Sequence, residues 1–186
     1  MPFKYTKEEA FKRWGIIIDS AFNLSNLDNK QKTVIENFIN KFPKFDNRKI
    51  GLTLISNMFD FDASILSMSI SDHLFNKISN SIKIINIPSI VIEYQRYSTS
   101  NEALEELNNS ITIGDLVIIQ EIAPIKYNEQ QKLIINYILN KLINNKKPFV
   151  ITSNNSIKDI TENLGLLITK LIYTYSTTID IKLRSK

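Results

Sequence analysis

Hydrophobic residues follow two patterns along the chain. Short, almost uniformly apolar runs predict buried strands, whereas apolar residues spaced three and four apart predict helices. The apolar runs lie at 50–55, 82–87, 115–119 and 149–152, and an Ile-, Thr- and Tyr-rich tail at 171–183 predicts a fifth strand. Buried strands that alternate with helices are typical of a parallel sheet covered on both faces, so the fold class is α/β with five parallel strands.

Helical segments fill the intervals between these strands. A capping box, Thr6-x-x-Glu9, precedes a short helix that carries Phe11 and Trp14. Further helices are expected over about 29–42, 63–78, 88–97, 102–108, 128–144 and 156–164. We therefore expect residues 1–20 to form an N-terminal helical extension and residues 21–186 to form one α/β domain.

Composition removes several classes of chemistry. The 186 residues include no Cys and only one His, His73, which excludes thiol catalysis and disfavours His triads and multi-His metal sites. We expect no metal site. The lack of Cys fits a cytoplasmic location, and no run of about 18 apolar residues is present that would span a membrane. The net charge of +4 mildly favours polyanionic partners.

The segment after the first apolar run lies where a nucleotide-binding loop belongs. A P-loop reads G-x-x-x-x-G-K-[ST] between a strand and a helix, and its glycines, lysine and hydroxyl hold the phosphates and Mg²⁺. Here Ser56 takes the place of the first glycine, Asp62 that of the lysine and Ala63 that of the hydroxyl. A carboxylate in the place of the lysine repels a triphosphate. We therefore expect no bound nucleotide cofactor.

Two later segments carry polar residues at the ends of apolar runs. The sequence 116–121, Leu-Val-Ile-Ile-Gln-Glu, has the form of a Walker B motif, with Gln120 at the metal-binding position and Glu121 at the catalytic position. Asn154 follows the next apolar run. Each segment also has a simpler interpretation: 116–121 as a buried strand that ends in a polar loop, and Asn154 as part of a Ser- and Asn-rich turn before a helix.

The order and spacing of these segments resemble the AAA+ domain of bacterial replicative-helicase loaders, the DnaC/DnaI family. The resemblance covers about residues 21–183. The matching pieces are Gly51-Leu-x-Leu, Ile85-Asn-Ile-Pro, Asp115-Leu-Val-Ile-Ile-Gln-Glu-Ile-Ala-Pro, Lys146-Lys-Pro-Phe-Val-Ile-Thr-Ser-Asn and Leu164-Gly.

This resemblance implies a fold and a set of roles. The fold is a P-loop NTPase-like, three-layer AAA+ domain with a five-stranded parallel sheet, here without an obvious lid domain. Glu121 matches the catalytic Glu of the family and Asn154 its sensor Asn. The arginines of the family fall in 166–171, where Lys170 is the only cation, and Lys replaces a planar arginine poorly.

Three residues are candidates for contacting DNA. Arg96 lies between Tyr94 and Tyr97, so Arg96 and Tyr97 are suited to stack on bases and touch phosphate. Lys126 precedes a Lys-containing helix. The alternatives are that the tyrosines pack their own helix and that the lysines form a solvated face.

These features predict an ATPase-inactive module in DNA replication, whose partner is a replicative helicase, a helicase loader or an initiator. The protein then works through its surfaces, with no membrane partner, and assembles with itself or a paralogue. Two alternatives stay open. One is an active loader that uses ATP and Mg²⁺ through an irregular loop. The other is an accessory protein that binds single-stranded DNA.

Overall fold

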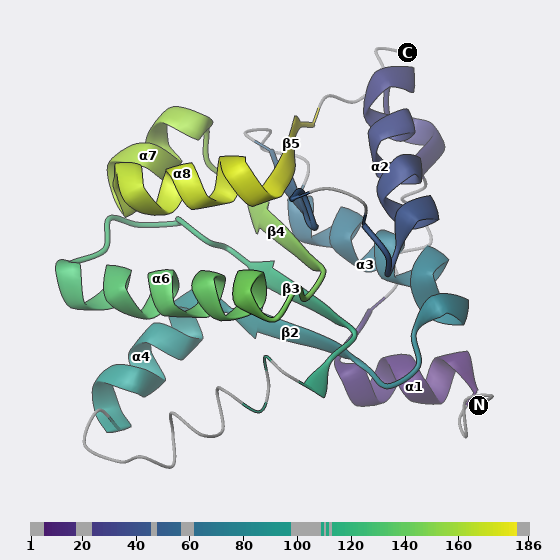
Figure 1. Ribbon diagram of the computed structural model, residues 1–186, viewed down its shortest axis with the longest axis horizontal. Coiled ribbons are helices and arrows are strands. Elements are labelled where there is room, and N and C mark those ends of the chain that lie inside the picture. Colours follow the sequence, from purple (N-terminus) through teal and green to yellow (C-terminus); the bar gives the residue numbers. More distant parts are fainter. Residues whose placement is uncertain are drawn as a thin grey trace.

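A parallel, five-stranded sheet forms the centre of the protein (Figure 1). The computed structural model describes residues 6–17, 24–45, 48–56, 62–97, 109, 111 and 113–181. The strand order is β2-β3-β4-β1-β5, and every neighbouring pair is parallel. The strands are β1 (Gly51–Ile55), β2 (Ile82–Asn86), β3 (Leu116–Gln120), β4 (Phe149–Ser153) and β5 (Ser176–Asp180).

The N-terminal helices cover one face of this sheet. Their apolar side chains form one core with Leu52, Leu54, Ile118 and Val150, which all point to that face. The helices and 3₁₀ turns on this side are α1 (Lys7–Trp14), η1 (Leu24–Asn26), α2 (Asn29–Lys41), α3 (Ala63–Leu74) and η2 (Phe75–Lys77).

The later helices cover the opposite face, where Val117, Ile119 and Ile151 point from the alternate strand positions. These helices are α4 (Ile87–Tyr97), α6 (Glu129–Asn144), α7 (Ile157–Leu164) and α8 (Leu166–Tyr175). The result is the three-layer arrangement that the sequence predicts, and the described residues contain no lid domain. Among the described helices, none combines the length and the apolar character that crossing a bilayer requires.

Helix α1 is tied to the first core by aromatic contacts. Phe11 is buried, and its ring meets Phe75 edge-on at 5.5 Å and Trp14 at 5.9 Å. The predicted capping box forms, because the Thr6 side chain accepts from the Glu9 N–H and the Glu9 carboxylate accepts from the Thr6 N–H at 2.9 Å. The expected division at residue 20 stays a prediction.

The expected strand at 171–183 is wrong in its first part. Residues 171–175 belong to α8, and only Ser176–Asp180 pair as a strand. Ile168 and Ile172, four positions apart, both pack into the second core. That helical spacing outweighs the strand preference of Ile, Thr and Tyr. The helix expected at 102–108 lies outside the described residues.

Candidate functional site

The candidate residues follow strands that end at one edge of the sheet. Ser56 follows β1, Glu121 follows β3 and Asn154 follows β4. Because the strands are parallel, their carboxyl ends meet, and the backbone joins them beyond the ladder. The Ser56 N–H donates to the Ser153 carbonyl at 2.9 Å, and the Ile122 N–H donates to the Thr152 carbonyl at 3.1 Å.

The first turn of α3 has its N–H groups bonded within the protein. The Ala63 N–H donates to Oδ1 of Asn154 at 3.1 Å. The Ser64 N–H donates to Oδ1 of Asp62 at 2.8 Å, and the Ile65 N–H donates to the Asp62 carbonyl at 3.1 Å. The Asn154 amide also donates to Oδ1 of Asp62 at 3.2 Å. Asp62 is therefore the N-cap of α3, and Asn154 locks that cap to the end of β4.

This cap occupies the position where a P-loop protein binds phosphate. A helix N-terminus attracts anions, because its first N–H groups lack partners and the helix dipole is positive there. In this chain the Asp62 carboxylate is the anion, and the Asn154 amide oxygen takes a further donor. Ala63 offers no hydroxyl for Mg²⁺. The described first turn of α3 thus has no N–H group left for a ligand.

Glu121 is held in an unusual backbone conformation just after β3. Its φ is 54°, in the left-handed region that residues with a Cβ seldom adopt. Its carboxylate accepts from the Asn86 amide at 3.2 Å, and its N–H faces Oγ1 of Thr152 at 3.4 Å. Gln120, beside it, ends β3 opposite Asn86 in the register of β2. Glu121 is half-buried and points along the same edge as Asn154 and Thr152.

Tyr127 is a buried titratable group near Glu121. Its side chain is 3% exposed, and its hydroxyl has no hydrogen-bond partner. Burial, and secondarily the charge of Glu121, raises the pKa of Tyr127 to about 12. The sequence reading missed both Tyr127 and Asn86. A signal existed for Asn86, since a polar residue ends an apolar run just before Pro88.

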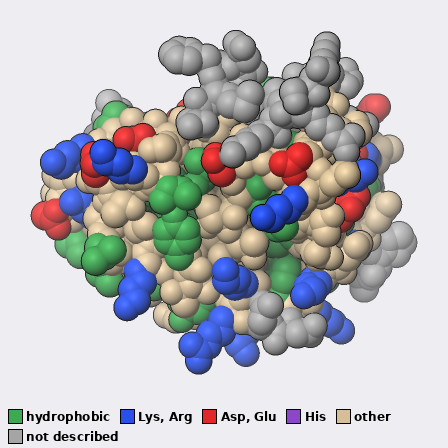
Figure 2. Space-filling model, turned by 90° about the horizontal axis from the view of Figure 1, so that it is seen from above, with side chains coloured by type: hydrophobic (Ala, Val, Ile, Leu, Met, Phe, Trp, Pro, Cys, Tyr) green, Lys and Arg blue, Asp and Glu red, His purple; other side chains and the backbone are tan. Residues whose placement is uncertain are grey.

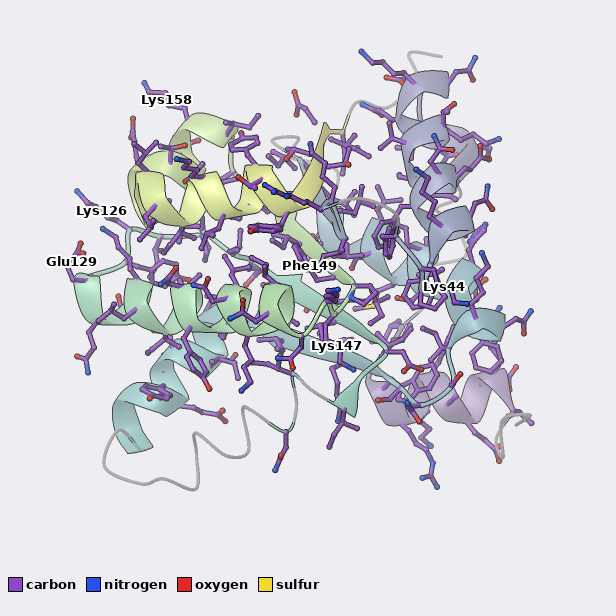
Figure 3. All side chains as sticks on the ribbon, viewed as in Figure 1. Lys44, Lys126, Glu129, Lys147, Phe149 and Lys158 are labelled. Atoms are coloured by element: carbon purple, nitrogen blue, oxygen red, sulfur yellow. The ribbon has the colours of Figure 1, made fainter. Side chains whose placement is uncertain are left out.

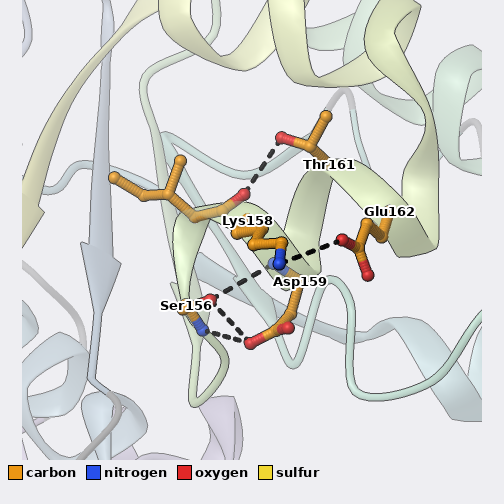
Figure 4. A network of polar contacts seen from close by, with 6 residues as sticks. Ser156, Lys158, Asp159, Thr161 and Glu162 are labelled. Atoms are coloured by element: carbon orange, nitrogen blue, oxygen red, sulfur yellow. Dashed lines mark hydrogen bonds and ion pairs between the residues drawn. The ribbon is translucent and has the colours of Figure 1, made fainter.

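The turn after β4 divides its polar residues between two helices. Asn154 reaches α3, whereas Ser156 is the N-cap of α7 (Figure 4). The Ser156 hydroxyl accepts from the Asp159 N–H at 3.2 Å and donates to the Asp159 carboxylate at 2.6 Å. A surface ion pair, Lys158 to Glu162 at 3.8 Å, lies beside this capping box (Figure 4). The predicted helix cap is therefore present, but Asn154 is not part of it.

The DNA candidates do not form a described site. Arg96 and Tyr97 close helix α4, but their side chains lie outside the described part of the chain. Tyr94 is half-buried and packs on the second core. Lys126 is exposed in the loop before α6 and points outward (Figure 3). Lys170 is exposed on α8. Within the described ranges, no three His, Asp or Glu side chains are grouped as metal ligands.

The protein is similar to solved structures, whereas its sequence matches no known family. No protein-family model and no curated protein matches the sequence. A crystal structure of DnaI has a TM-score of 0.72 and 18% identity, and the match covers 96% of this chain and 95% of DnaI. The DnaC helicase loader has a TM-score of 0.69 and 17% identity, over 92% of this chain and 99% of that chain.

The replication initiator DnaA, in a structure bound to AMPPCP and single-stranded DNA, has a TM-score of 0.68 and 10% identity. That match covers 90% of this chain and 52% of DnaA. The matches to the two helicase loaders cover nearly the whole of both chains, whereas the match to DnaA covers about half of DnaA. This agrees with the order of motifs in the sequence. The protein has the AAA+ fold of the DnaC and DnaI helicase loaders.

Proposed function

We propose that this protein is a non-catalytic AAA+ module of DNA replication, which binds a replicative helicase, a helicase loader or an initiator instead of hydrolysing ATP. One observation carries the proposal. The first turn of α3 is capped by Asp62 and Asn154, so the N–H groups at this helix N-terminus, a position that binds phosphate in a P-loop protein, have internal partners. A phosphate that approached this turn would meet a carboxylate.

Other positions support the same proposal. Gln120 stands where a carboxylate would hold Mg²⁺, and an amide is a weaker partner for that ion. Lys170 is the only cation of the segment where the loaders carry arginines, and a flexible ammonium cannot copy the planar fork of arginine. The changes affect three separate functions of an ATPase site: phosphate binding, metal binding and charge stabilisation.

An exposed apolar patch offers a surface for a protein partner. It comprises Leu166 and Leu167 at the start of α8, which are 76% and 67% exposed. Figure 2 shows hydrophobic side chains open to solvent on the side of the molecule where this helix lies. Exposed apolar clusters commonly mark sites of protein association.

An active loader is the second candidate, and the position of Glu121 favours it. Glu121 and Asn154 lie at one edge, as a catalytic base and a sensor would in an ATP- and Mg²⁺-dependent enzyme. Binding ATP at α3 would require Asn154 to leave the Ala63 N–H and Asp62 to leave the Ser64 N–H. This candidate therefore predicts a nucleotide-dependent rearrangement of the α3 cap.

Partner binding tests the proposal directly. The purified protein is titrated against the replicative helicase, the helicase loader and the replication initiator of its own host, with and without ATP. We expect a complex whose affinity does not change with ATP, and at least about tenfold weaker binding for L166D/L167D, as for a buried hot spot. Ile125→Asp, at another exposed apolar residue, is the matched control. Binding to none of the three proteins, or binding only with ATP, contradicts the proposal.

A further inference from the structure

A basic pocket lies at the amino edge of the sheet, opposite the edge that carries Asp62 and Asn154. Its volume is about 670 Å³. Its cations are Lys44, Arg48 and Lys146, and its aromatic residues are Phe45 and Tyr175. These residues immediately precede β1, β4 and β5, so the backbone of the sheet fixes their spacing. No Asp or Glu among the described residues lines this pocket.

A second, smaller pocket of about 240 Å³ lies on the other side of Phe45, beside α2. Phe45 lines both pockets, and the second one adds Lys41 and Lys49. We call the two pockets together, with Phe45 between them, the amino-edge groove. Its members are Lys41, Lys44, Phe45, Arg48, Lys49, Lys146 and Tyr175.

The cations of the groove are exposed and close in space. Figure 2 shows several Lys and Arg side chains along the lower edge of the view, whereas Lys, Arg, Asp and Glu side chains are mixed over the rest of this face. Clustered charge of one sign in a concave surface attracts a polyanion of the opposite sign.

Lys146 is in a backbone conformation that normally belongs to glycine. It ends α6 with a φ of 51°, and its N–H donates to the Ile143 carbonyl while the Lys147 N–H donates to the Leu142 carbonyl. This is a Schellman motif, in which the residue at the position of Lys146 is usually Gly. The chain therefore keeps a cation in the groove at a conformational cost, a pattern associated with functional sites.

Two rings give the groove a second recognition element. Phe45 is half-buried and its ring lies 5.2 Å from that of Phe38, and Tyr175 is half-buried against the second core. Because packing already holds both rings, a base that stacks on them meets little ordering cost. Cations beside aromatic rings are typical of surfaces that bind single-stranded nucleic acid. An acidic peptide would use the cations and leave the rings without a role.

We propose that the amino-edge groove binds nucleotide units, with phosphates on Lys44, Arg48 and Lys146 and a base stacked on Tyr175 or Phe45. The nucleotide units would bind at the opposite edge of the sheet from the capped α3 turn. The inference therefore does not depend on whether that turn binds ATP or on which protein is the partner.

Fluorescence anisotropy with a labelled single DNA strand of about 16 nucleotides tests the proposal. We expect salt-sensitive binding, and at least tenfold weaker binding for K44E/R48E. Lys146→Gly should weaken binding and reduce the slope of log K against log salt by about 0.7, since one phosphate contact is lost. The same variant should not lower Tm, because glycine suits the left-handed position. Lys158→Ala, on α7, is the control that removes a distant charge.

A further variant and two competitors distinguish nucleic acid from a free nucleotide and from an acidic protein. Tyr175→Leu keeps the burial and removes the stacking, so it should weaken DNA binding about fivefold or more. If thymidine monophosphate competes at micromolar concentration, the ligand of the groove is a free nucleotide. If only DNA strands compete, the ligand is a nucleic acid. Wild-type affinity in K44E/R48E overturns the proposal. It is also overturned if polyglutamate displaces the strand equally well and Tyr175→Leu has no effect, which indicates an acidic protein.

Discussion

At Asp62, one carboxylate caps the N-terminus of α3 and also contacts the end of β4. It accepts from the Ser64 N–H at 2.8 Å and from the Asn154 amide at 3.2 Å. Asp62→Ala should lower the free energy of unfolding by about 1 kcal/mol, the usual value of an N-cap. Asp62→Asn should retain most of this stability, because an amide oxygen also caps. Urea denaturation of the two variants compares them, and an equal loss in both would mean that charge, not capping, matters.

Gly51 is required at the start of β1 by the ring of Phe149. A Cβ at residue 51 would collide with this ring, which is 1% exposed and cannot move into solvent. Gly51→Ala should therefore destabilise the protein by about 1–3 kcal/mol through overpacking.

The double variant G51A/F149L checks the cause of this loss. Removing the ring makes room for the new methyl group, so the double variant should be more stable than the sum of the two single losses predicts, by at least about 0.5 kcal/mol. Chemical denaturation of the four proteins gives the coupling. Strict additivity would show that the cost of Gly51→Ala arises elsewhere.

For individual residues, the sequence predicts which of them lie together at the carboxyl ends of the strands, but it does not predict the hydrogen bonds that their side chains form. A parallel sheet brings Ser56, Glu121 and Asn154 to one edge whenever the strands are placed correctly, and they were. That Asn154 would bond the Ala63 N–H depends on a side-chain rotamer across two elements, which no local pattern encodes. Tyr127 was missed for a similar reason, since its burial comes from tertiary packing.

At the scale of elements, the apolar runs predict the strands well and the tail poorly. Four strands begin and end within about two residues of their predicted positions, because all four runs are apolar and those of β1, β3 and β4 are almost wholly buried between two helical layers. In the tail, Ile, Thr and Tyr suit a strand, yet 171–175 are helical. Burial of Ile168 and Ile172 on one helical face decides the outcome, and this requires knowledge of the opposing core.

Helix α1 provides a prediction that depends on pH. Hydrogen bonds from the Thr6 N–H and hydroxyl lower the pKa of Glu9 below its usual value of 4.5. A carboxyl group whose pKa is lowered by folding stabilises the native state above its unfolded pKa, and this contribution is lost as the pH falls through the folded pKa. Glu9→Ala should therefore reduce Tm near neutral pH and have a shrinking effect below pH 4.5.

Trp14 makes this experiment simple, since it is the only tryptophan of the chain and lies on α1 against Phe75. Its fluorescence reports the docking of α1, while circular dichroism reports the whole domain. Glu9→Gln, which keeps a capping side chain, is the matched control. A Tm difference that stays constant from pH 7 to pH 3 would contradict the assigned role of Glu9.

At the scale of the whole molecule, the sheet has two edges with opposite character. At the carboxyl edge, the first turn of α3 is capped by the Asp62 and Asn154 side chains. The amino edge carries the basic amino-edge groove. The apolar patch at Leu166 and Leu167 lies on a third surface, formed by α8. The fold is that of the helicase loaders, and the two surfaces that we propose for binding lie away from the capped α3 turn.

The central claim is that the carboxyl edge does not bind nucleotide. Isothermal titration calorimetry of the purified protein with ATP and Mg²⁺ tests it most directly, with Asp62→Asn as a companion that removes the repelling charge and keeps the cap. We expect no saturable heat up to millimolar ATP for the wild-type protein. Saturable binding would contradict this claim, and ATP hydrolysis that Glu121→Gln abolishes would in addition identify an active ATPase.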